Sequence, residues 1–136
     1  MFELKPDEAR LLLNVALMAT GQNRFQSATR ILSALEAFRP GHESLAVAKA
    51  VLMISMREYG MALGFIDGEA LAAHPGSALL RAFRGLALIR LDRRGEAEDC
   101  LRAAACSADA AAANLARGLL GELAAKTTGH SEVEHG

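Results

Sequence analysis

Apolar and polar residues repeat in the same order in three segments of the chain. In each segment an alanine is followed four residues later by a large aliphatic residue, which is the spacing of one side of a helix. The alanines are Ala28, Ala62 and Ala97, which lie 34 and 35 residues apart. The segments are NRFQSATRILSALEAFRP (23–40), REYGMALGFIDGEALAAHP (57–75) and DRRGEAEDCLRAAACSAD (92–109). We therefore predict three amphipathic helices that belong to one repeating unit.

A second apolar helix is predicted upstream of each segment. The corresponding sequences are ARLLLNVALMAT (9–20), ESLAVAKAVLMISM (43–56) and ALLRAFRGLALIRL (78–91). Two helices of a hairpin approach closely only where side chains are small, so we expect the three alanines to pack against the first helix of their own pair. Pro40 and Pro75 are expected to end the second helices, because proline cannot continue a helix.

This order resembles the tetratricopeptide repeat, a helical hairpin of 34 residues. The resemblance rests on small residues in the first helices, aromatics before two of the alanines, and the aliphatic residues after all three: Ala16, Ala50, Gly85, Phe25, Tyr59, Leu32, Ile66 and Leu101. It implies an all-α fold of three tetratricopeptide-like hairpins in a short superhelical array, plus a C-terminal capping helix. We place the repeats at about 9–42, 43–76 and 78–109, and the capping helix at 110–126. Residues 1–127 would form one domain, and the polar stretch 128–136 is expected to be disordered.

Three glycines interrupt the second helix of the second repeat. Gly60, Gly64 and Gly68 follow one another at intervals of four residues, although glycine weakens a helix interior by about 1 kcal/mol. We interpret Gly60 and Gly64 as a site where a neighbouring helix approaches closely. Gly68 coincides with the one extra residue that delays Pro75, so we predict a loosened or early-ending helix there.

Composition and charge exclude several classes of function. Hydrophobic residues make up 51% of the chain, aromatics only 4%, and the formal net charge is -1. This charge favours neither nucleic acid nor an anionic membrane as a partner. The start MFELKPDEAR lacks the basic and apolar regions of a signal peptide, and no uncharged apolar run is long enough to span a membrane. Cys100 and Cys106 lie too far apart on one helix for a disulfide, so we expect free thiols and a cytoplasmic protein.

Residues for catalysis are not evident in the sequence. It contains no phosphate-binding glycine motif, and His42 and His74 fall at predicted turns, where histidines are usually solvated. The C-terminal histidines and glutamates, His130, Glu132, Glu134 and His135, are not expected to hold a metal on a disordered segment. We therefore expect no catalytic residues, no cofactor, no metal and no enzymatic activity.

In tetratricopeptide arrays the first helices line the concave side, and the resemblance implies which positions face inward. Here these positions are almost all aliphatic: Leu13, Leu17, Val47, Val51, Ile54, Leu79, Phe83, Leu86 and Ile89. Ordinary interhelical core is one interpretation of this set. The other is an apolar groove that accepts an amphipathic helix of a partner.

Three local stretches also resemble the tetratricopeptide chaperones of bacterial type III secretion, most of all the needle-subunit chaperones. They are LLNVALMATGQNRFQSA, AVLMISMREYGMAL and ACSADAAAANLARGLLGEL. The resemblance implies a cytoplasmic bacterial chaperone that holds a small helical secreted needle protein and prevents its premature polymerisation, together with a second small helical co-chaperone. The alternatives are an export-apparatus chaperone of the same system, or a general interaction scaffold that forms a homodimer when alone.

Overall fold

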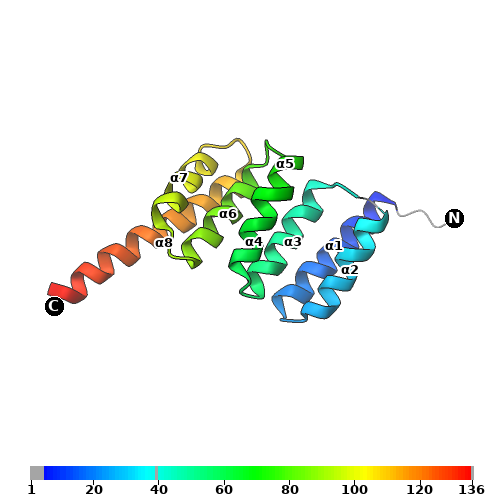
Figure 1. Cartoon of the computed structure of the whole chain (residues 1–136), viewed down its shortest axis with the longest axis horizontal. Helices are drawn as coiled ribbons and strands as arrows, with labels where there is room; N and C mark the ends of the chain where they lie inside the picture. Colours follow the sequence, from blue (N-terminus) through cyan, green and yellow to red (C-terminus); the bar gives the residue numbers. More distant parts are fainter. Residues whose placement is uncertain (1–4, 39, 136) are drawn as a thin grey trace.

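The protein is all-α, as the sequence predicts. The computed structural model describes the backbone of residues 5–38 and 40–135, and the side chains of 5–38 and 40–125. Seven helices follow one another in this part of the chain, the fourth of which changes its winding along its length (Figure 1). Their bounds are α1 Pro6–Gly21, α2 Phe25–Phe38, α3 Glu43–Ser55, α4 Tyr59–Phe65 continued by the π-helix η1 Ile66–Ala70 and by α5 Leu71–Ala73, α6 Ala78–Arg90, α7 Arg94–Ala105 and α8 Ala110–His135.

Sequential helices pack as pairs. α1 packs against α2, α3 against α4, and α6 against α7. The first helices of successive pairs also contact one another, so that α3 lies between α1 and α6. α8 packs against both α6 and α7 and covers the last pair (Figure 1). The pairs therefore form a row, with α1 and α2 at one end and α8 at the other.

The turns inside the three pairs have the same backbone geometry. Asn23, Arg57 and Asp92 have φ angles of 62°, 63° and 60°, in the left-handed region that residues other than glycine seldom occupy. Each donates its backbone N–H to the carbonyl three residues earlier, at 3.1, 2.9 and 3.0 Å. These residues are spaced as the three alanines are, so the period read from the sequence is also a period of the backbone.

The repeated small and aliphatic positions form the interior of the row. Ala28, Ala62 and Ala97 are each 0% exposed, which confirms that they are packing positions. Leu32, Ile66 and Leu101 are at most 2% exposed, and the small residues of the first helices are also buried: Ala16, Ala50 and Gly85. Phe25 and Tyr59 are half-buried beside the turns.

The helix that contains the three glycines loses its regular winding at Gly68, as predicted. It continues as the π-helix η1 over Ile66–Ala70 before it returns to α-helix in α5. A π-helix bonds each N–H one residue further back than an α-helix does, so a single turn of it accommodates an extra residue. The prediction for Gly60 and Gly64 is wrong, because both are exposed and a Cβ at either would meet nothing within 4 Å.

The capping helix is longer than the sequence indicates. α8 begins at Ala110, as expected, but continues to His135, whereas we expected disorder over 128–136. Figure 1 shows the C-terminal part of α8 projecting past the packed helices. Backbone hydrogen bonds within a helix need no apolar side to bury, so the absence of hydrophobic periodicity did not mark a helix end. The side chains of His130, Glu132, Glu134 and His135 lie outside the described ones. None of the helices in the described part combines the length and hydropathy needed to cross a bilayer.

Candidate partner-binding face

The nine aliphatic and aromatic residues singled out in the sequence lie on the first helices of the three pairs. α1 carries Leu13 and Leu17; α3 carries Val47, Val51 and Ile54; α6 carries Leu79, Phe83, Leu86 and Ile89. On each helix the members follow at intervals of three or four residues, so they share one side of that helix. Because α3 contacts both α1 and α6, the three groups lie on neighbouring helices. We call this set the aliphatic face.

The aliphatic face is only partly covered by the rest of the chain. Leu17 is 38% exposed, and the other eight residues are half-buried. None of the nine belongs to the fully buried core. Large apolar side chains that stay partly exposed on neighbouring helices are typical of a contact surface.

Helix α3 shows most clearly that the residues of the aliphatic face are not needed to form the buried core. Its buried residues Leu45, Ala48 and Leu52 join the core formed with α1 and α2, yet Val47 and Val51 on the same helix remain half-buried. Between 45 and 54 the only charged residue is Lys49. A helix that is apolar on nearly every side is normally enclosed, whereas α3 is not fully enclosed by its neighbours.

The C-terminal part of the aliphatic face already packs against α8 of the same chain. Leu86 and Ile89 pack against a buried cluster that includes Leu119 and Leu123 of α8. Ile89 also contacts the cluster around Leu88. For these two residues the interpretation as interhelical core is the better one. The sequence did not reveal this, because the spacing along α6 does not say where α8 lies.

The largest cavities that we describe lie on another side of the molecule, between helices α2, α3 and α4 and between α5, α6 and α7. The first has a volume of about 490 Å³, and the second of about 460 Å³. Two smaller ones, of about 210 and 180 Å³, lie between α1, α2 and α3 and between α2, α3 and the helix that contains η1. Of the aliphatic face, only Leu13 lines one of these four cavities.

The cavity between α2 and α4 was not foreseen from the sequence. Its apolar lining includes Leu52, Met61 and Phe65, and Gly64 leaves the α4 side of the cavity open. Lys49 also lines the cavity, forms an ion pair with Glu36 of α2, and lies 6.0 Å from the centre of the Phe65 ring. The glycines on α4 were the sequence feature that could have predicted this cavity. They mark positions where a surface lacks side chains, and not a close contact with another helix.

Two charged residues that line the cavity between α6 and α7, Arg84 and Glu96, form ion pairs with residues outside its lining. Arg84 donates two hydrogen bonds to the Asp67 carboxylate, at 2.6 and 3.4 Å, and this interaction raises the pKa of Arg84 above its ordinary value. Arg93 binds Glu96 in the same bidentate way, at 2.9 and 2.8 Å, and lowers the pKa of that exposed carboxyl. Such paired charges at a surface mainly orient the side chains that form them.

The thiol of Cys100 also lines this cavity and donates a hydrogen bond to the carbonyl oxygen of Arg81, with Sγ 3.0 Å away. Within the described residues, no three side chains of His, Cys, Asp or Glu lie close enough to share a metal ion.

Comparisons with protein-family models, with curated proteins and with solved structures found no match to this chain.

Proposed function

We propose that this protein is a chaperone that holds an amphipathic helix of a partner against the aliphatic face. The observation that carries the proposal is the partial exposure of α3: Val47, Val51 and Ile54 remain accessible after Leu45 and Leu52 have completed the core. A partner helix that presents apolar residues at intervals of three or four would cover them. Burying three or four large side chains contributes about 1.5–3 kcal/mol each before the ordering costs.

The needle-subunit chaperones of bacterial type III secretion are the class that fits this binding mode best. The repeated turns at Asn23, Arg57 and Asp92 support a repeat array of the tetratricopeptide kind, and the sequence resemblance supports the specific class. The cargo in this proposal is a small helical secreted needle protein, which polymerises unless its apolar helix is covered. A second small helical co-chaperone would complete the complex in the bacterial cytoplasm. Holding a helix in this way requires no cofactor.

Co-expression with a type III needle subunit tests the proposal. We expect the wild-type protein to co-purify with the subunit and to suppress its polymerisation, followed by light scattering. Val51→Asp puts a charge on the aliphatic face and should weaken capture at least ~10-fold, which corresponds to the ~1.4 kcal/mol that one lost apolar contact supplies. Leu17→Asp tests the same face at its exposed end.

Met61→Asp is the matched control. Met61 is 59% exposed and lies on α4, away from the aliphatic face, so this variant should capture the subunit as well as the wild type does. Circular dichroism of each variant separates lost binding from lost folding. Undiminished capture by both Val51→Asp and Leu17→Asp would reject the aliphatic face as the binding site, and failure of the folded wild type to bind any needle subunit would reject the class.

A further inference from the structure

Three residues of the aliphatic face already pack inside the chain. Leu13 packs against the buried cluster that α1, α2 and α3 form, and Leu86 and Ile89 pack against the cluster that α6 and α7 share with α8. None of the described buried clusters includes or contacts the other six residues, which we call the free footprint: Leu17, Val47, Val51, Ile54, Leu79 and Phe83. The free footprint is the part of the aliphatic face that a partner can cover.

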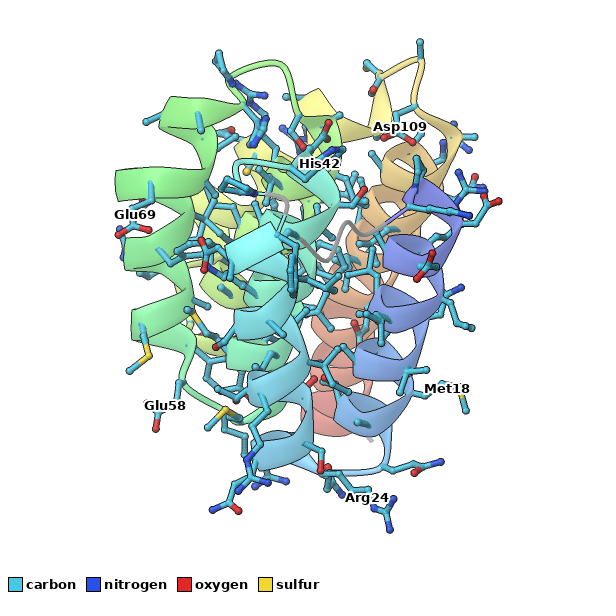
Figure 2. All side chains as sticks on the ribbon, turned by 90° about the vertical axis from the view of Figure 1, so that its right-hand side faces the viewer. Met18, Arg24, His42, Glu58, Glu69 and Asp109 are labelled. Carbon is cyan, nitrogen blue, oxygen red and sulfur yellow. The ribbon has the colours of Figure 1, made fainter. Side chains whose placement is uncertain are left out.

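The first helices of the pairs all run in the same direction, so positions along them can be compared. Figure 2 looks along the row from its α1 end. Arg24 and Glu58, which lie in the turns inside pairs one and two, are at one edge of the molecule. His42 and Asp109, which precede α3 and α8, are at the opposite edge. The N-terminal halves of the first helices therefore lie toward one edge and their C-terminal halves toward the other.

The free footprint crosses the row obliquely. On α6 its members, Leu79 and Phe83, lie in the N-terminal half of the helix, because α8 covers the apolar residues of the other half. On α1 its one member, Leu17, lies in the C-terminal half, because Leu13 belongs to the core. On α3, between them, the footprint extends along most of the helix, from Val47 to Ile54.

We propose that the partner helix lies along this oblique line, from the N-terminal half of α6, over α3, to the C-terminal half of α1. The inference rests on the proposed function, since it takes the aliphatic face as the binding site. Packed helices lie about 8–10 Å apart, so α1 and α6 are separated by roughly twice that distance. At 1.5 Å per residue the partner needs at least ~11–13 residues of continuous helix. Its apolar residues must recur about every two turns to meet all three helices.

The two ends of the free footprint select for a partner of this length. Phe83 is its only aromatic residue, and aromatic side chains contribute the largest apolar area to an interface. Leu17, at the other end, is 38% exposed and is the most accessible of the nine residues of the aliphatic face. A shorter amphipathic helix can cover α3 but cannot reach both Phe83 and Leu17. These two residues are therefore specificity-determining positions of the site.

Two matched pairs of alanine variants test this arrangement, with a fluorescently labelled type III needle subunit as the probe. Phe83 and Leu86 are both half-buried on α6, but only Phe83 belongs to the free footprint. Phe83→Ala should raise the Kd at least ~10-fold, as loss of an interface anchor does, and Leu86→Ala should change it less than ~2-fold. Leu17→Ala and Leu13→Ala form the second pair, and only Leu17→Ala should weaken binding. Fluorescence anisotropy measures each Kd.

Urea unfolding without the partner provides an independent readout. Leu13→Ala should lower the urea midpoint more than Leu17→Ala does, because only Leu13 packs against the buried core; equal midpoints overturn the division of the face. If the wild type binds but Leu86→Ala weakens binding as much as Phe83→Ala does, the oblique footprint is wrong and the proposed function stands. If the folded wild type does not bind, the proposed function fails and the footprint fails with it.

Discussion

Gly85 of α6 lies directly against Leu101 of α7, and its replacement by alanine is expected to destabilise the protein. A Cβ at this position of α6 would lie 2.5 Å from Cδ2 and 2.6 Å from Cγ of Leu101 on α7. Carbon atoms in contact are normally about 3.5–4.0 Å apart. One of the two helices or the leucine side chain must therefore move by about 1 Å to admit a methyl group.

Leu101 has little freedom to make that movement. It is 0% exposed and packs in a cluster with Ala82, Ala104 and Ala116. Because Cγ is too close as well as Cδ2, rotating the terminal methyl groups alone does not relieve the overlap. Overpacking of this kind costs about 1–3 kcal/mol, and the better helix propensity of alanine offsets about 1 kcal/mol. We expect Gly85→Ala to lower the free energy of unfolding by ~0–2 kcal/mol.

Gly118 provides the matched control for this measurement. It lies inside α8, is exposed, and a Cβ there would meet nothing within 4 Å. Gly118→Ala should therefore show only the propensity gain, roughly 0.5–1 kcal/mol in favour of folding. The difference between the two variants, about 1–3 kcal/mol, is the cost of the overlap. Urea unfolding followed by circular dichroism at 222 nm measures both free energies.

A second substitution tests whether the overlap with Leu101 is the cause. Leu101→Ala alone should cost about 2–5 kcal/mol through the cavity it leaves. In the double variant the new methyl group of residue 85 has space, so the combined cost should fall short of the sum by more than ~1 kcal/mol. If Gly85→Ala proves as stable as Gly118→Ala, or if the two costs simply add, the close approach of α6 and α7 is not what requires glycine here.

Three further variants test the turns and the joint between pairs two and three. Ser77→Ala removes both the cap of α6 and a 2.6 Å hydrogen bond to Glu43, so it should cost ~1–2 kcal/mol in urea unfolding. Arg57→Gly relieves a left-handed backbone at φ 63° and should gain roughly 0.5–1 kcal/mol, seen as a higher Tm. Deleting Gly68 should convert η1 to α-helix, and the amides of 66–70 should then exchange no faster with solvent than before.

The sequence predicted the interior of this fold well because the interior depends on side-chain size. Ala28, Ala62 and Ala97 recur at one period because a helix crossing admits only small side chains, and each is fully buried. Because such a crossing accepts only alanine or glycine, these positions can be recognised from the residue types alone. The same logic located Gly85, whose place in the repeat matches Ala16 and Ala50.

Exposure could not be predicted in the same way, because it depends on neighbours distant in the sequence. The spacing on α6 placed Leu86 on the side of the helix shared with Leu79, but only the position of α8 decides that Leu86 is partly covered. Gly64 and Gly85 are the same residue type in similar helices. One faces open space and the other touches Leu101, and no local pattern distinguishes them.

The one-residue difference between the repeats is absorbed inside a helix rather than in a connection. α2 ends at Phe38 and α3 begins at Glu43; α5 ends at Ala73 and α6 begins at Ala78. The two connections are therefore equally long, and the extra residue must lie in the second helix of pair two. The π-turn at η1 is the place where a helix can hold it without displacing its ends. Ser77 thus still reaches Glu43 across the joint, and the first helices stay in contact from α1 to α6.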